Sequence, residues 1–300
     1  MISNVRTRKL GTVSRAVAFS VVAIFLLAIG GASLASAQQA PAATANPQPA
    51  SNRAQPEPIN FDDHDGWTQI FDGKTLNGWD GSPDVWHVED GAIVGESSAQ
   101  HPSGTTNIIW HGGEPANFRL RLEMKLEGAG ANGGVQYRSN IVPPKIRPIP
   151  ADAAPDVKQR MEQAQALALK RGKWNMSGYQ MDFDFGNRYT GQLYEQGTPR
   201  GIIAWRGQVV ATGPGKKPTL LSTLGGPDEL KAFIKPGDWN QVEIVADGNT
   251  LVHIVNGHVM SVLVDTDPQF SAARGSIALE IEGGGTLKIS HRNIWLKPLP

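Results

Sequence analysis

The stretch SGYQMDFDFGNRYTGQLYE, from Ser177 to Glu195, decides the fold. Apolar and polar residues alternate strictly over residues 179–185, which is typical of a β-strand with one buried face. The aromatic and methionine side chains would pack a core on one side. Gln180, Asp182 and Asp184 would project from the other side, with neighbours about 7 Å apart, because a strand rises about 3.3 Å per residue.

A row of two aspartates and an amide is unusual on a strand, because Asp is disfavoured there. The row has two interpretations, a solvated outer face or a binding surface. The chain continues with TGQLYE, which brings Tyr194 and Glu195 straight back after a Gly-Asn turn. This return favours the binding surface.

Short apolar runs separated by turn signals fill the chain from Gly66 onward. Asp-Gly or Asn-Gly pairs at 90–91, 247–248 and 256–257 are strong hairpin signals. The run FRLRLEMKL, residues 118–126, alternates without a fault, and its mixed charges favour a solvated outer face. The spacing predicts an all-β fold, a two-sheet antiparallel sandwich of the jelly-roll kind.

Residues 141–173 interrupt the strand rhythm with the proline-rich run PPKIRPIP and then a helical pattern that ends at Gly172. A long insertion between two strands that carry polar rows predicts a lid or rim. Trp174, at its exit, would either stack on a sugar ring or hold the helix down.

The N-terminus predicts export. Basic residues precede the apolar run AVAFSVVAIFLLAI, and Ala35-Ser36-Ala37 is a small-x-small cleavage signal. We therefore expect a signal peptide over 1–37, a disordered leader over 38–60 and a folded domain over 61–300. The expected location is the periplasm or the medium, with no membrane anchor after cleavage. The chain has no cysteine, which excludes disulfides and thiolate chemistry.

The charge argues against some partners. The chain has 28 basic and 28 acidic residues, and the predicted signal peptide removes four basic residues and no acidic ones, which leaves −4. A mildly acidic surface argues against nucleic acid and anionic membranes as partners.

Several blocks follow one another between Gly66 and Leu299: FDGKTLNGW, WHVEDGAIVGE, ANGGVQYRS, SGYQMDFDF, TGQLYE, GDWNQVEIVADGNTLVHIVNGH and RNIWLKPL. In this order they resemble the 3-keto-disaccharide hydrolase family, a former domain of unknown function with a concanavalin A-like jelly roll. The resemblance implies activity on glycosides that carry a ketone at sugar C3. The family's usual strand reads Gly-Tyr-Glu-x-Gln, and Gln180 and Asp182 stand in place of the Glu and the Gln.

The run QMDFDF also resembles the Glu-x-Asp-x-Glu strand of retaining β-glucanases, which need a carboxylate nucleophile. Gln180 cannot form the glycosyl ester, so ordinary retaining hydrolysis is disfavoured. A 3-keto sugar offers elimination instead: a base removes the acidified C2 hydrogen, C1 expels its substituent, and water adds afterwards. That route needs a base, a group that stabilises the enolate, and an acid for the leaving group.

The catalytic candidates follow from these needs. The base would be Asp182 or Asp184, and the acid Glu195 or Tyr194. Arg138, or a bound cation, would hold the enolate. Hard oxygen donors suited to calcium or magnesium are present in Gln180, Asp182, Asp184 and Glu195.

Further residues are candidates for substrate binding. Gln136 would share a face with Arg138 on the strand VQYRSN, Asn132 lies in the preceding Gly-rich loop, and His111 precedes Gly112-Gly113. The row Gln180, Asp182 and Asp184 and the row Gln136 and Arg138 would line one concave cleft, with the proline-rich insertion and Trp174 at its rim. The alternative function is a carbohydrate-binding module of the same fold without chemistry.

Overall fold

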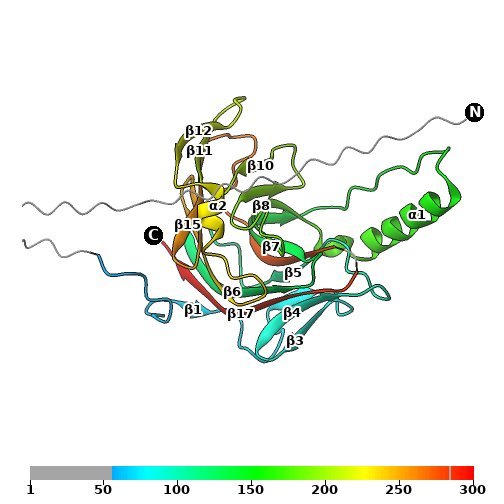
Figure 1. Ribbon diagram of the computed structural model, residues 1–300, viewed down its shortest axis with the longest axis horizontal. Coiled ribbons are helices and arrows are strands. Elements are labelled where there is room, and N and C mark those ends of the chain that lie inside the picture. The colour runs from blue at the N-terminus through cyan, green and yellow to red at the C-terminus, as the bar shows by residue number, and fades with distance from the viewer. Residues whose placement is uncertain (1–55, 284) are drawn as a thin grey trace, which may run out of the picture. The chain divides into compact units, whose positions relative to one another are not determined.

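The computed structural model describes residues 56–283 and 285–300, of which 57–300 belong to one compact unit. The predicted signal peptide, and most of the predicted leader, lie outside the described residues. Strands dominate the unit and form two antiparallel-rich sheets (Figure 1). No helix in this part of the chain is long and apolar enough to cross a membrane.

The larger sheet has ten strands, and β1 pairs with β17 at its side. In spatial order the others are β12 (Thr219–Thr223), β11 (Gln208–Thr212), β15 (His258–Asp265), β14 (Thr250–Val255), β13 (Asn240–Asp247), β6 (Phe118–Glu127), β17 (Leu287–Pro298), β4 (Ala92–Ser97) and β3 (Trp86–Glu89), and β1 spans Thr68–Gln69.

The smaller sheet has seven strands and carries the polar row on β8. In spatial order they are β10 (Gly201–Ala204), β9 (Leu193–Gln196), β8 (Met176–Asp184), β7 (Asn132–Ile141), β16 (Ser276–Glu282), β5 (Thr106–Trp110) and β2 (Trp79–Gly81). Neighbours far apart in sequence, such as β7 and β16, therefore lie side by side.

The core fills the space between the two sheets. Tyr179, Met181 and Phe183 of β8 are almost fully buried there, as the alternation predicts. They pack in the same cluster as Leu122 of β6 and Val242 of β13, which belong to the other sheet. The predicted all-β two-sheet sandwich is confirmed.

The hairpin signals also mark real turns. Asp90-Gly91 joins β3 to β4 and Asn256-Gly257 joins β14 to β15, and all four residues have positive φ. Positive φ at both central positions is the requirement of a type I′ turn, which Asp-Gly and Asn-Gly satisfy most easily.

The insertion contains helix α1 (Pro155–Lys170), followed by a 3-10 turn over Gly172–Trp174. Pro155 begins the helix, and no residue of α1 is buried. Figure 1 shows α1 standing to one side of the two sheets. A helix that buries so little contributes little to the core, so it is suited to forming a rim.

The outer face of β6 is not simply solvated, which corrects the expectation for residues 118–126. Arg121 is only 4% exposed and pairs with Glu243 of β13. The carbonyls of Asn60 and Asp63 accept hydrogen bonds from its guanidinium, and the ring of Trp67 lies 4.3 Å from it. The segment before β1 therefore covers this part of the sheet.

Candidate active site

A cleft of about 670 Å³ opens on the face of the smaller sheet that points away from the core. Strands β8 and β9, the loop before β5 and the ends of β7 and β16 form its floor. The 141–173 insertion forms its opposite wall. The polar side chains that line it are Ser103, Thr105, Asn132, Lys145, Arg147, Arg171, Asn175, Gln180, Asp182, Tyr189, Gln192, Tyr194, Gln196 and Glu282.

The strand register explains why an amide lies at the centre of the floor. Gln180 lies opposite Gln136 of β7 and Tyr194 of β9. Two pairs along, Gly134 lies between Asp182 on β8 and Glu280 on β16. A Cβ at Gly134 would meet the backbone oxygen of Met181 at 2.5 Å and Cγ of Gln180 at 2.7 Å, so only glycine leaves room for the Gln180 side chain.

Gln180 connects two carboxyl groups through that gap. Its Nε2 donates to Oδ1 of Asp182 at 2.8 Å and to Oε2 of Glu280 at 2.7 Å. Its Oε1 accepts a hydrogen bond from Nε2 of Gln136. Because both amide protons and the oxygen are engaged, the orientation of Gln180 is fixed.

Two further amides complete the network. Nε2 of Gln192 donates to Oδ2 of Asp182 at 2.6 Å, and Nε2 of Gln196 donates to Oε1 of Glu280 at 2.5 Å. Each carboxyl group is therefore held by two neutral amides. Neither forms an ion pair with Lys, Arg or His in the described chain.

Burial without a counter-ion raises the pKa values of both groups. It raises the pKa of Asp182 from 3.8 to about 7 and that of Glu280 from 4.5 to about 8. The negative charge of Glu282 adds to both shifts. Two carboxyl groups that change protonation around neutral pH are what a proton-transfer site requires.

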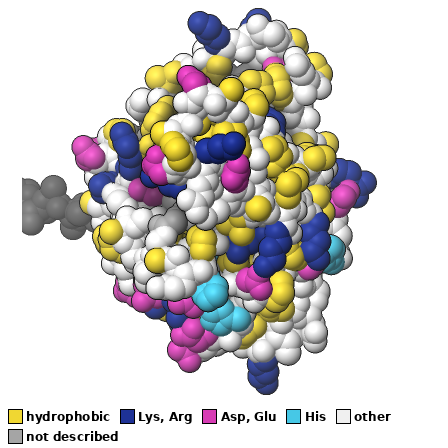
Figure 2. All heavy atoms as spheres, turned by 90° about the vertical axis from the view of Figure 1, so that its right-hand side faces the viewer, with side chains coloured by type: hydrophobic (Ala, Val, Ile, Leu, Met, Phe, Trp, Pro, Cys, Tyr) yellow, Lys and Arg dark blue, Asp and Glu magenta, His cyan; other side chains and the backbone are white. Residues whose placement is uncertain are grey.

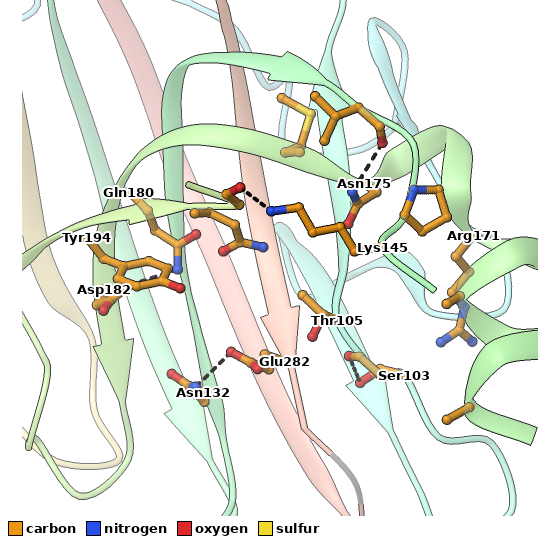
Figure 3. Close-up of a pocket in the computed structure, with 18 of the residues that line it drawn as sticks. Ser103, Thr105, Asn132, Lys145, Arg171, Asn175, Gln180, Asp182, Tyr194 and Glu282 are labelled. Atoms are coloured by element: carbon orange, nitrogen blue, oxygen red, sulfur yellow. Dashed lines mark hydrogen bonds between the residues drawn. The ribbon is translucent and has the colours of Figure 1, made fainter. Parts of the chain in front are cut away.

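Glu282 and Tyr194 complete the floor. Oε2 of Glu282 accepts a hydrogen bond from Nδ2 of Asn132 at 3.0 Å, and burial raises its pKa. Burial and the charge of Asp182 raise the pKa of Tyr194, so its phenol keeps its proton at neutral pH. Figure 3 shows Tyr194 beside Asp182, with Asn132 and Glu282 on the neighbouring strands.

Asp182, Gln180, Tyr194 and Asn132 therefore lie together in the cleft, as the sequence predicts. Gln136 lies directly behind them. It is fully buried, and its Oε1 accepts from the hydroxyl of Ser139 at 2.8 Å. Gln136 supports Gln180 and does not line the cleft.

Asp184 has a structural position instead. Its carboxylate accepts backbone N–H bonds from Arg188 at 3.1 Å, Tyr189 at 2.6 Å and Thr190 at 3.2 Å. These bonds close the turn after β8. The alternation is correct, but Asp184 is the last residue of the strand, where a carboxylate can fold over the following loop.

Glu195 lies on the other face of the sheet, opposite Tyr179. Its carboxylate takes a bidentate pair from Arg200, at 2.7 and 2.6 Å, and Arg200 also reaches Asp265 at 2.7 Å. Adjacent residues on a strand point to opposite faces, so Tyr194 and Glu195 cannot both enter one cleft.

Arg138 does not share a face with Gln136. The pairing of β7 with β8 jumps from Tyr137 to Asn140, and Arg138 has a φ of 46°. This bulge turns its guanidinium away from the cleft. It donates to the carbonyls of Ala116, Gly248 and Ala272 and to Oδ1 of Asn117.

Trp174 and His111 lie outside the cleft. Trp174 is 6% exposed and packs with Ile109, Met176 and Ala278 on the outer face of the smaller sheet. It holds the end of the insertion against the sheet, which is the second of the two roles expected for Trp174. The side chain of His111 is 56% exposed, and its Nε2 lies 4.0 Å from Oδ2 of Asp80.

The structure separates the four oxygen-donor side chains that were expected to bind calcium or magnesium. Asp184 binds backbone N–H groups and Glu195 binds Arg200, so neither joins Gln180 and Asp182. Within residues 56–283 and 285–300, no group of three or more His, Asp or Glu side chains has the arrangement of a metal site.

Sequence reasoning missed Glu280 and Glu282. Both lie on the outer face of β16, which is next to β7, and the segment SIALEIE alternates as clearly as β8 does. The signal was present, because two acids occupy one face of an otherwise apolar strand. What the sequence lacks is the pairing that brings β16 beside β7.

Comparison with known proteins identifies a matching family and a related protein. The sequence pattern of the 3-keto-alpha-glucoside-1,2-lyase-like domain matches residues 66–297. The 3-keto-disaccharide hydrolase of Bacteroides thetaiotaomicron is 39% identical over 207 residues, which are 64% of this chain and 56% of that protein. The chain thus spans little more than half the length of that relative.

Solved structures resemble the chain more distantly. A protein of Parabacteroides distasonis is 17% identical over 79% of this chain and 95% of its own, with a TM-score of 0.43. The carbohydrate binding module CBM66 from Bacillus subtilis is 10% identical over 73% of this chain and 95% of its own, with a TM-score of 0.41. The architecture therefore rests on the sheet topology described above.

Proposed function

Because the chain belongs to the family of 3-keto-alpha-glucoside-1,2-lyase-like domains, we propose that its cleft cleaves the glycosidic bond of glycosides oxidised to a ketone at sugar C3. The observation that carries the proposal is the pair Asp182 and Glu280. These buried carboxyl groups have pKa values of about 7 and about 8, and a single glutamine connects them. The name of the Bacteroides relative supports the same substrate class.

Asp182 is the proposed base. It lines the cleft, and two amides orient its carboxylate without neutralising it. With a pKa of about 7, a substantial fraction of Asp182 is ionised at neutral pH and remains basic enough to accept a proton. It takes the C2 hydrogen, and the electrons of the C–H bond pass into the enolate at C2 and C3.

Tyr194 is the proposed acid. It lies across from Gln180 on β9, and its raised pKa keeps the phenol protonated. As the enolate collapses, the ketone re-forms, a C1–C2 double bond appears and the C1–O bond breaks. The departing oxygen takes the phenol proton.

Lys145 is the group proposed to stabilise the negative charge of the enolate. Its ammonium donates to the carbonyl of Gly197 at 2.7 Å, beside Gln196, and it lines the cleft from the insertion. A positive group held near a developing oxyanion stabilises the transition state. It takes the role that the sequence suggested for Arg138.

Water completes the net hydrolysis. Its oxygen adds to C1 and a hydrogen returns to C2, which gives the free 3-keto sugar. Glu282 lines the cleft beside Asn132 and has a raised pKa, so it is placed to activate this water. If water does not add, the product is the unsaturated ketone.

The test is incubation with 3-keto-trehalose, 3-keto-sucrose and the parent sugars, with Asp182→Asn alongside the wild type. We expect cleavage of the oxidised sugars only, and loss of most turnover in the variant. Cleavage of unoxidised glycosides by the wild type would contradict the proposal. Binding of the oxidised sugars without turnover would indicate the carbohydrate-binding module instead.

The sequence also supports a location outside the cytoplasm. The apolar run before Ala37 predicts cleavage there, so the exported protein should begin near Gln38. Mass spectrometry of the exported pool checks this, and a retained N-terminus would contradict it.

A further inference from the structure

The insertion wall of the cleft carries an unpaired buried arginine. Arg171, directly after α1, is 6% exposed and lines the cleft. Its Nη1 donates to the carbonyl of Pro102 at 2.9 Å, and its buried Nε has no partner. In the described chain it forms no ion pair, although the charge of Asp84, which pairs with Lys170, still acts on it.

Two other buried arginines of this protein make more side-chain hydrogen bonds than Arg171 does. Arg138 is 2% exposed and makes four hydrogen bonds, and Arg206 is 6% exposed and donates to the carbonyls of Pro227, Thr190 and Asn187. Arg171 makes one such side-chain bond at the same burial as Arg206. A guanidinium taken out of water and left with free donors is costly unless a ligand engages it.

The charge of the cleft is divided between its two walls. Lys145, Arg147 and Arg171 lie on the insertion side, while Asp182 and Glu282 lie on the sheet side. In Figure 3, Asp182 and Tyr194 lie at one end of the cleft and Arg171 at the other, with Thr105 and Glu282 between them. On the outer surface that carries α1, by contrast, the charged side chains of both signs are interspersed (Figure 2).

We propose that the Arg171 end of the cleft is a subsite for an anionic group on the leaving part of the substrate, such as a carboxylate, sulfate or phosphate. The inference rests on the proposed function, which places the sugar over Asp182. The leaving group then extends toward the insertion wall. Nε of Arg171 is too buried to reach a ligand, but Nη2, which makes no hydrogen bond in the described chain, can donate to an oxyanion in the cleft.

Binding of unoxidised probes tests the subsite without requiring any turnover. The probes are 4-carboxyphenyl α-glucoside and 4-carbamoylphenyl α-glucoside, which have similar shape and differ in charge. We expect calorimetry to show the acid binding at least about tenfold more tightly than the amide. Arg171→Gln should abolish that preference and leave binding of the amide unchanged.

Arg160→Gln is the matched control, because Arg160 lies on the exposed side of α1 and pairs with Asp156. It should keep the preference. If Arg171→Gln does not fold, the wild type is tested instead at salt concentrations of about 20 and about 500 mM. The higher concentration should weaken binding of the acid and leave binding of the amide unchanged.

Equal binding of both probes to the wild type would overturn the subsite, and so would loss of the preference in Arg160→Gln. Inorganic sulfate is the third probe. If sulfate binds as tightly as the carboxyphenyl glucoside, the site takes a free anion, which overturns its assignment to the leaving group. Failure of the proposed function would appear separately, as absence of cleavage of 3-keto-trehalose with the probe preference intact.

Discussion

Replacing Asp182 by asparagine should make the fold less sensitive to alkaline pH. Burial raises the pKa of Asp182 from 3.8 to about 7, so the unfolded chain loses this proton at lower pH than the folded protein does. Below pH 3.8 Asp182 is protonated in both the folded and the unfolded chain, so it does not lower the free energy of unfolding. As the pH rises from 3.8 to about 7 the folded state loses stability, and above that range the loss is complete.

The magnitude follows from the two pKa values. Each pH unit between them costs about 1.4 kcal/mol, so between pH 5.0 and 8.5 the wild type should lose about 3 kcal/mol from Asp182 alone. Asp182→Asn removes that loss. It also removes a negative charge that raises the pKa of Glu280, which lessens the second contribution.

The site can accept the asparagine. Oε1 of Gln192 is buried without a partner, while Nε2 of the same amide donates to Asp182. A half-turn of that amide presents the oxygen to the new Nδ2 group. The other contact, from Nε2 of Gln180, is kept by the asparagine oxygen.

The assay is urea unfolding of both proteins at pH 5.0 and 8.5. Asp156→Asn, which changes an exposed carboxylate on α1, is the control and should behave as the wild type does. If the wild type and Asp182→Asn lose the same free energy of unfolding between the two pH values, Asp182 is not a buried group without a counter-ion. The proton-transfer role proposed for it would then lose its basis.

Three further variants separate structure from chemistry. Asp184→Ala removes the acceptor of three backbone N–H groups, so urea titration should show a loss of about 2–4 kcal/mol, with turnover per folded molecule unchanged; lost turnover in a stable variant would return Asp184 to the site. Arg200→Met leaves Glu195 and Asp265 buried without their cation and should cost about 3–5 kcal/mol by the same titration, and a neutral effect would show that the pair is dispensable. Tyr194→Phe should lower kcat by about 10²-fold or more while the melting temperature barely changes, and a kcat near that of the wild type would exclude Tyr194 as the acid.

The fold was predictable because the strands obey a period of two. The alternation over residues 179–185 puts Tyr179 and Met181 in the core and Gln180 and Asp182 in the cleft, as the structure has them. The same period also separates Tyr194 from Glu195, so applying it to β9 would have excluded Glu195 from the cleft.

Other features were not predictable from local patterns. The bulge at Arg138 has no glycine beside it on β7 itself, yet it reverses the alternation of β7 at that point. Glu280 reaches Gln180 only because β16, far along the chain, pairs with β7. Long-range pairing of this kind is set by the packing of the whole sandwich, and no single segment encodes it.

The most direct measurement of the central claim uses 3-keto-trehalose with deuterium at C2 of the oxidised ring. If Asp182 removes the C2 hydrogen, the wild type should cleave the labelled sugar severalfold more slowly than the unlabelled one, and the product should carry solvent hydrogen at C2. Asp182→Asn should lose most of the cleavage and most of the exchange of the label. Cleavage at an unchanged rate, with the deuterium retained in the product, would contradict elimination in this cleft.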